Sequence, residues 1–287
     1  MLTSAVILHH PQSEGAAALA ARTAADLRSH GVRVSVAAAW DTAAESDIPT
    51  TELVVCIGGD GTVLRAASLA VPHRVPLLGV NMGRLGFLTD ISPEELFDCV
   101  DRLVQRSWRI EERILVRGDL DDPADSGVGS YHGLNDIVIS RRAPGRPIYI
   151  ALGIDGARVA TYRCDGMIIS TPTGSTGYSL SAGGPILAPT EHHLVVTPVS
   201  AHLALGRSLV LQPHSSVELR VTSDHGAFLS VDGQRDLPMT SGAVVRAGVS
   251  EHRALFVRFR EQGSFYSELA EKLEFQMSSA MSPPAGA

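Results

Sequence analysis

The chain has 287 residues, 44% of them hydrophobic and 19% charged, and a net charge of −7. That acidic balance argues against a broad nucleic-acid surface, which needs clustered basic residues. No apolar run approaches the roughly 20 residues of a membrane span, and the N-terminus lacks the basic start of a signal peptide. Cys56, Cys99 and Cys164 form no C-x-x-C pair. They suit free thiols, so the sequence predicts a cytoplasmic globular protein.

Residues 1–107 alternate between strand-like and helix-like segments. Apolar strands are predicted at 4–10, 32–40, 52–57 and 75–81, and helices at 13–31, 62–71 and 92–106. Gly31 suits the C-terminal end of the first helix. Ser92 and Glu95 match a capping box, with Pro93 at the first helical position. The alternation predicts an α/β domain with a Rossmann-like parallel sheet that is covered by helices on both faces.

The pattern changes after residue 107. Residues 108–260 contain short strand-like runs separated by Gly, Pro and Asp, which is typical of a mainly antiparallel β domain. We expect the active site in the cleft between the two domains, a common place for a ligand. Residues 261–275 have an amphipathic helical pattern that could pack back onto the first domain. Residues 276–287 are small and Pro-containing, and a disordered tail is predicted there.

The residue content limits how this chain can handle phosphates. Lys272 is the only lysine among 24 basic residues, and it lies in the C-terminal helical pattern. A P-loop needs the lysine of its GK[ST] ending, and a protein kinase needs a strand lysine that binds the nucleotide phosphates. Both classes are therefore excluded. Phosphate chemistry must use backbone amides, arginines and a metal ion.

The first candidate motif is a glycine-rich loop, GGDGT, between a predicted strand and a predicted helix. The free N–H groups of Gly58, Gly59, Gly61 and Thr62, together with the helix dipole, favour an anion such as the phosphate of a donor. Asp60 should repel that anion unless it faces a divalent cation or takes a proton from an attacking hydroxyl. Both roles belong to phosphoryl transfer. The alternative is a tight turn in which Asp60 caps the helix.

The second motif, TPTGSTGYSLSAGGP, covers residues 171–185 and follows a predicted buried strand. Its dense hydroxyls and exposed backbone suit hydrogen bonds to ribose and phosphate oxygens. A nucleophilic serine is a weaker interpretation, because Gly174-Ser175-Thr176 does not match G-x-S-x-G. A plain Ser/Thr-rich loop is the structural alternative.

Several motifs together resemble the NAD kinase family over nearly the whole chain. In the family's order they are GGDGT, NMGRLGFLT (81–89), LNDIVISR (134–141), RCDG (163–166), TPTGSTGYSLSAGGP and SVDGQ (230–234). GGDGT alone also occurs in diacylglycerol-type lipid kinases, whereas the 171–185 block makes the resemblance specific. Two positions depart from the family: Gly177 stands where Ala is common, and residues 199–202 match one wall of the adenine pocket only loosely.

The resemblance implies roles for individual residues. Asp60 matches the acid that takes the proton from the 2′-hydroxyl of the adenosine ribose, while the glycine amides and Mg²⁺ bind the phosphates. Asn135 matches an amide suited to adenine edges and Asp136 an acid suited to ribose hydroxyls, although both residues could simply open a strand. The implied NAD contacts are Asp60, Gly61, Arg65, Asn135, Asp136, Arg146, Arg163, Asp165, Thr176, Gly177, Tyr178, Ser179, Leu180, Ser181 and Gln234.

The function implied by this resemblance is transfer of a phosphoryl group from ATP, or from inorganic polyphosphate, to NAD. A homodimer or homotetramer is expected. Two alternatives stay open at this level. A lipid kinase built on the same GGDGT loop would need an apolar surface for its lipid. A non-catalytic NAD sensor would have little use for an acid beside phosphates.

Overall fold

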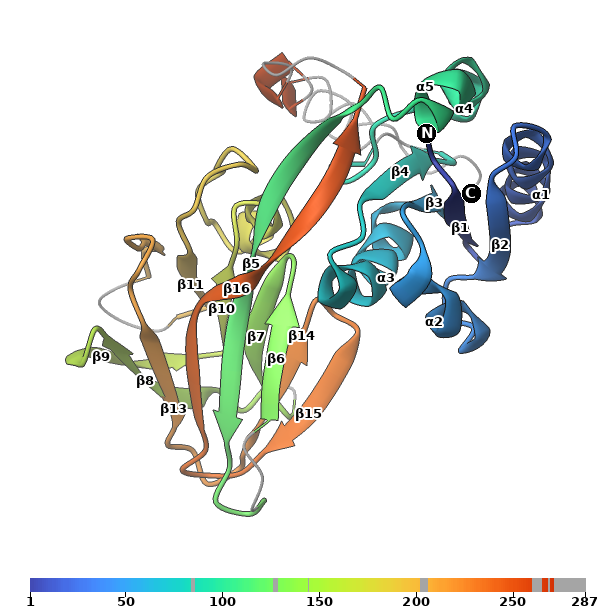
Figure 1. Cartoon of the computed structure of the whole chain (residues 1–287). Helices are drawn as coiled ribbons and strands as arrows, with labels where there is room; N and C mark the ends of the chain where they lie inside the picture. The colour runs from blue at the N-terminus through green and yellow to red at the C-terminus, as the bar shows by residue number, and fades with distance from the viewer. Residues whose placement is uncertain are drawn as a thin grey trace, which may run out of the picture.

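The computed structural model describes residues 1–83, 86–125, 129–143, 145–201, 206–259, 265–267 and 269–270, with the backbone alone at 43–44. Within these residues the chain forms two units, joined by a pair of long strands (Figure 1). The N-terminal unit contains four parallel strands in the order β2–β1–β3–β4. Their bounds are β1 (Ser4–His9), β2 (Arg33–Ala38), β3 (Val54–Gly58) and β4 (Leu77–Asn81).

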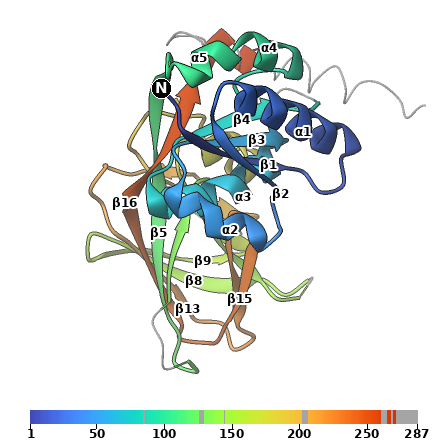
Figure 2. The same ribbon diagram turned by 45° about the vertical axis from the view of Figure 1, so that its right-hand side comes forward.

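Helices cover both faces of this parallel sheet (Figure 2). Side chains of α1 (Glu14–Ser29), α4 (Pro93–Asp98) and α5 (Val100–Val104) share a buried cluster with one face. Those of α3 (Asp60–Ala70) share a cluster with the other face. The short helix α2 (Ala43–Asp47) precedes a 3₁₀ turn at Ile48–Thr50. The alternation of strands and helices in the sequence predicted helices on both faces of the sheet, and the structure confirms this prediction.

The predicted helix ends are mostly confirmed. The Ser13 hydroxyl accepts a hydrogen bond from the Ala16 N–H at 3.2 Å at the start of α1, and Gly31 beyond its end has φ +81°. The Ser92–Glu95 capping box is present in full. However, the helix predicted at 92–106 is divided at Cys99 into α4 and α5.

The two long strands are β5 (Arg109–Asp121) and β16 (Val244–Arg258), which pair antiparallel. Because β16 also pairs in parallel with β4, through Phe256 and Leu77, one sheet continues from the first unit into the second. Among the short strand-like runs of the sequence after residue 107 are 243–248 and 252–259, and the structure joins these two runs into one bulged strand. The other members of this part of the sheet are β6 (Gly129–Gly133), β8 (Ile148–Ile154), β9 (Ala157–Cys164) and β13 (Val217–Val221).

A second, antiparallel sheet packs on this extension around one large buried cluster. Its strand order is β12–β11–β10–β7–β14–β15, and the short helix α6 (Tyr178–Ser181) follows β10 after a 3₁₀ turn at Gly174–Thr176. The predicted combination of an α/β unit with a mainly antiparallel β unit is confirmed. The strand bounds are β7 (Asp136–Arg141), β10 (Gly166–Ser170), β11 (Val195–Val199), β12 (Leu209–Val210), β14 (Ala227–Val231) and β15 (Arg235–Met239).

At the C-terminus, residues 265–267 and 269–270 are helical, in agreement with the helix predicted at 261–275. The other residues of that segment and the predicted tail at 276–287 lie outside the described residues. Among the described helices, none combines the length and apolar character that crossing a bilayer requires.

Candidate functional site

The GGDGT loop lies where β3 ends and α3 begins. Gly58 is the last residue of β3, Gly59 is the N-cap of α3, and Asp60 is its first residue. The Gly59 carbonyl accepts hydrogen bonds from the N–H groups of Thr62 and Val63 at 2.9 and 3.1 Å. The prediction of a free Thr62 N–H was therefore wrong, because this group closes the first turn of α3. Apart from the adjoining residues of the loop and helix, no described atom lies within 4 Å of where a Cβ on Gly59 or Gly61 would sit. A ligand can therefore reach the backbone here.

Two backbone amides hold the Asp60 carboxylate. Oδ2 accepts from the Phe87 N–H at 3.0 Å, and Oδ1 accepts from the Leu88 N–H at 3.1 Å. This approach requires glycine at position 86, because a Cβ there would lie 2.0 Å from Asp60 Oδ1. A carboxylate has about four lone-pair sites, so each oxygen can still accept from a substrate or bind a cation.

The segment that supplies those amides is itself fixed against the sheet. Asp90 N–H donates to the Gly79 carbonyl at 2.9 Å, and Asn81 N–H donates to the Ile91 carbonyl at 2.9 Å. The segment thus continues beside β4, next to the loop that follows β3. The NMGRLGFLT motif therefore acts on Asp60 through its backbone, which explains why its side chains gave no indication of this role.

A cavity of about 740 Å³ lies between α3 and the β unit. Three residues predicted to bind the substrate line it: Gly61, Arg65 and Gln234. Arg65 is held at its wall, since Nη2 pairs with Glu45 Oε1 at 2.8 Å and Nε donates to the Ala39 carbonyl at 3.1 Å. The exposed ring of Trp40 lines the same cavity. Its volume falls within the usual range for small-molecule sites.

Asp232 links this cavity to the Asn135–Asp136 pair. Its carboxylate accepts hydrogen bonds from the N–H groups of Leu134, Asn135 and Asp136 at 2.8, 2.7 and 3.0 Å. Asp232 lies in the turn between β14 and β15, with φ 51°. The SVDGQ turn therefore positions the predicted adenine and ribose contacts. From that motif the sequence singled out Gln234 and missed this acid.

Asp136 is a buried acid that lies beside Asp232. Burial, with the Asp232 charge, raises the pKa of Asp136 from 3.8 to about 7. Its proton is therefore retained in the folded chain at pH values where the unfolded chain has lost it. Between about pH 4 and 7 the unfolded chain binds fewer protons, so the folded state loses stability as pH rises through this window.

Replacing Asp136 with asparagine removes that penalty. We expect Asp136→Asn to raise the free energy of unfolding by about 2–4 kcal/mol at pH 8, relative to wild type, and to change it little at pH 4. Urea unfolding across this pH range measures the difference. The exposed Asp236→Asn is the matched control. A difference between Asp136→Asn and wild type that is the same at both pH values contradicts the raised pKa.

Several hydroxyls of the 171–185 block are used inside the protein. Thr171 Oγ1 donates to the Leu134 carbonyl at 2.5 Å, Ser175 Oγ donates to the Pro172 carbonyl at 2.6 Å, and Ser179 Oγ bonds Thr197 Oγ1 at 3.1 Å. All three residues are fully buried. These hydroxyls fix the loop and do not face a ligand. Of the predicted contacts in this block, Thr176 and Leu180 are partly exposed, and Gly177, Tyr178 and Ser181 are exposed.

Three other predicted contacts, Arg146, Arg163 and Asp165, do not line the cavity beside the GGDGT loop. Asp165, next to the start of β10, forms an ion pair with Arg141 at 2.9 Å. Asp136 on β7 stands opposite Ser170, at the other end of β10. At about 3.4 Å per residue, the length of β10 separates the two acids by roughly 17 Å. Arg163 and Arg146 are both exposed, on β9 and before β8.

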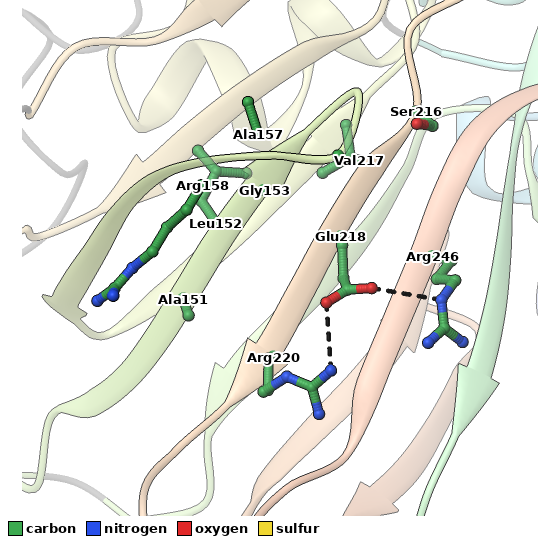
Figure 3. A pocket seen from close by; sticks show the side chains of 11 residues that line it. Ala151, Leu152, Gly153, Ala157, Arg158, Ser216, Val217, Glu218, Arg220 and Arg246 are labelled. Atoms are coloured by element: carbon green, nitrogen blue, oxygen red, sulfur yellow. Dashed lines mark hydrogen bonds and ion pairs between the residues drawn. The ribbon is translucent and has the colours of Figure 1, made fainter.

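A second hollow of about 440 Å³ lies on the sheet formed by β8, β9, β13 and β16. Within it, Glu218 pairs with Arg220 at 3.2 Å and with Arg246 at 3.3 Å (Figure 3). None of the residues predicted to bind substrate lines this hollow. The candidate site is therefore the larger cavity beside the GGDGT loop.

A buried ion cluster, which no sequence motif predicted, contacts the segment that holds Asp60. Glu111 Oε1 accepts from Arg113 Nη2 at 2.9 Å and from Arg258 Nη2 at 3.0 Å, and Arg258 Nη1 lies 3.5 Å from Asp90 Oδ1. Burial, with Arg258 nearby, lowers the pKa of Arg113 to about 10, although the charges of Glu111 and Asp60 oppose this. The cluster joins β5, β16 and the segment that holds Asp60.

Comparison with family models agrees with this arrangement. Residues 5–108 match the model described as ATP-NAD kinase N-terminal domain, and residues 134–259 match the one described as ATP-NAD kinase C-terminal domain. An NAD kinase of Dehalococcoides mccartyi is 36% identical over 269 residues, which cover 93% of this chain and 95% of the relative. An NAD kinase of Heliobacterium modesticaldum is 42% identical over 229 residues, covering 78% of each.

Solved structures show the same architecture. An Archaeoglobus fulgidus NAD kinase in complex with ATP is 27% identical, with a TM-score of 0.77 over 95% of this chain and 99% of that one. A yeast NADH kinase in complex with NADH matches with a TM-score of 0.84 at 23% identity, over 100% of this chain and 90% of that one. The second likeness bears on the fold alone.

Proposed function

The chain belongs to the NAD kinase family and transfers a phosphoryl group to NAD, and we propose that Asp60 is the general base of this reaction. In this proposal one Asp60 carboxylate oxygen accepts the proton of the 2′-hydroxyl on the adenosine ribose, while the 2′-oxygen attacks the terminal phosphorus of the donor. The bond between that phosphorus and the bridging oxygen breaks, and the remainder of the donor (ADP when the donor is ATP) leaves. A positioned base of this kind contributes about 10²–10⁴ to the rate.

One observation carries this assignment. The amides of Phe87 and Leu88 fix the Asp60 carboxylate at the first turn of α3, beside a loop whose backbone is open at Gly59 and Gly61. An acid that only caps the helix would bond the amides of α3. Asp60 instead bonds amides of another segment, which orients its remaining lone pairs. The geometry supports an acid that is held ready for a substrate.

The proposed cofactor is Mg²⁺ or another divalent cation. Mg²⁺ is usually held by one or two carboxylates together with substrate phosphates. The loop fits that pattern, because Asp60 is its only carboxylate and keeps free lone pairs. When bound, the cation would neutralise charge on the transferred phosphoryl group. The amides of Gly59 and Gly61 would bind the phosphate oxygens, and Arg65 at the cavity wall would add positive charge.

ATP is the proposed donor, supported by the related Archaeoglobus enzyme that was crystallised with ATP. The proposed dinucleotide contacts are the residues that the family resemblance assigns, with Asn135 on adenine and Asp136 on the ribose. The test incubates purified protein with NAD, Mg²⁺ and either ATP or polyphosphate, and reads NADP with an NADP-specific dehydrogenase. We expect NADP formation with ATP. No NADP with either donor would refute the proposed reaction.

We further propose a cytoplasmic homodimer or homotetramer. The three cysteines are all free and buried, as suits a reducing compartment. Tyr149 and Val159 on the β8–β9 hairpin are exposed apolar side chains that a second copy could cover. Light scattering of the purified protein would show a mass of two or four chains, and a monomer at micromolar concentration contradicts the proposal.

A further inference from the structure

Strand β16 carries an irregularity beside the cavity. Val249 pairs with Val116 and Arg253 with Ile114, so the three residues Ser250, Glu251 and His252 stand opposite one residue of β5. Bulges of this kind re-aim side chains and are common next to functional sites. Arg253 stabilises the bulge, since its Nη1 donates to the carbonyls of Ser250 and His252 at 2.5 and 2.8 Å.

The bulge brings its side chains to His132 of β6, on the far side of β5. The rings of His132 and His252 have their centroids 4.8 Å apart. One ligand atom each from His132, Glu251 and His252 lies within 4.8 Å of the others. Both histidines also line the cavity that contains Gly61 and Gln234. Residues more than a hundred positions apart thus converge at its wall.

We propose that His132, Glu251 and His252 bind a divalent cation that prefers imidazole ligands, of the class of Zn²⁺. Two imidazoles and a carboxylate are a common ligand set for such ions, and a site with three protein ligands leaves coordination positions open. Because both histidines line the cavity, those positions face the space that a nucleotide would enter. The site is separate from the proposed Mg²⁺, which prefers oxygen ligands.

Neighbouring groups prepare the ligands. His132 Nδ1 bonds Ser250 Oγ at 2.8 Å, and when Nδ1 carries the proton, the Nε2 lone pair is free for the metal. Glu251 Oε1 lies 3.9 Å from His252 Nε2. Its Oε2 lies 3.8 Å from Arg117, so one oxygen stays available.

The distances require a small contraction on binding. Ligand atoms at about 2.0–2.1 Å from a tetrahedral zinc lie roughly 3.3 Å apart, so the three atoms must draw together by up to about 1.5 Å. Glu251 and His252 have exposed side chains, 58% and 38%, that can turn toward His132. The alternative is an edge-on pair of histidine rings that binds no metal, and it predicts no saturable binding.

The test uses the full chain, stripped of metal and without nucleotide, at pH 7.5. Zn²⁺ affinity is measured by competition with a chromophoric chelator, and Co²⁺ absorption reports the ligand geometry. We expect one equivalent of Zn²⁺, bound at least tenfold more weakly in His132→Ala and in His252→Ala. The exposed His214→Ala is the matched control and should bind as wild type does. Millimolar Mg²⁺ should not displace Zn²⁺.

These readouts are independent of kinase activity, so they separate this site from the proposed reaction. If His132→Ala fails to fold, His252→Ala decides the question, because that side chain is partly exposed. Absence of one-to-one binding in wild type overturns the proposal. So does an affinity in His252→Ala that equals that of His214→Ala.

Discussion

Asp60→Asn is expected to lower kcat by about 10²–10⁴ while leaving the affinity for NAD within about tenfold of wild type. Asparagine keeps the size of the side chain but cannot take the proton of the ribose hydroxyl. Asparagine also changes the two hydrogen bonds that hold the side chain at position 60. Its oxygen can accept from one of the two amides, Phe87 or Leu88, but its NH₂ group then opposes the other. Steady-state kinetics and NAD titration measure the two effects separately.

Two comparison variants make this result specific. Asp224→Asn changes an exposed acid in the β unit and should keep wild-type kcat. Gly86→Ala places a methyl group against Asp60 Oδ1, so it should displace the carboxylate and lower kcat with the acid still present. A Gly86→Ala enzyme with wild-type kcat would mean that the amide contacts are not needed. Wild-type kcat in Asp60→Asn would remove Asp60 from the role of base.

Glu111→Ala is expected to lower the free energy of unfolding by about 3–5 kcal/mol at pH 7. Glu111 is the acid shared by the buried guanidinium groups of Arg113 and Arg258. Without Glu111, the two neighbouring positive charges stay buried with fewer negative charges near them. The fall in the free energy of unfolding therefore exceeds the net stabilisation that the ion pairs contribute. Denaturant unfolding measures this change. The neighbouring Glu112→Ala, at an exposed position of β5, is the matched control and should cost far less.

The same variant has a predictable pH dependence. Burial raises the pKa of Glu111, but the charges of Arg258 and Arg113 outweigh burial and lower it below 4.5. The stabilisation is therefore complete above the unfolded value of 4.5 and is lost as pH falls through the lower folded value. The difference between Glu111→Ala and wild type should shrink below about pH 4. A difference that does not change with pH would contradict the ionised state of Glu111.

The sequence predicted the N-terminal unit well because its signals are local. Caps such as Ser13 and Ser92, and apolar runs with clear ends, depend on neighbours within a few residues. The β unit was less predictable. Strand β15 is polar and contains Pro238, which suits an edge strand but gives little hydrophobic pattern. The joining of two predicted strands into β16 depends on its pairing with the distant β5.

In the candidate site, too, local features were predictable from the sequence and long-range contacts were not. The GGDGT loop was predictable because a strand, glycines and a helix follow one another in the chain. The contacts that hold Asp60 span 27 and 28 residues, and those that join Asp232 to the Asn135 turn span 96 to 98. Hydroxyls predicted to face a ligand, such as that of Ser179, are instead buried in bonds within the protein. Residue type alone does not distinguish these two uses.

A crystal structure of the chain with NAD, Mg²⁺ and a non-hydrolysable ATP analogue would test the role of Asp60 most directly. We expect an Asp60 carboxylate oxygen about 2.6–3.2 Å from the 2′-oxygen of the adenosine ribose, with the 2′-oxygen in line with the terminal phosphate. A complex in which the Asp60 carboxylate points away from the ribose, with a different side chain bonded to the 2′-oxygen, would contradict it.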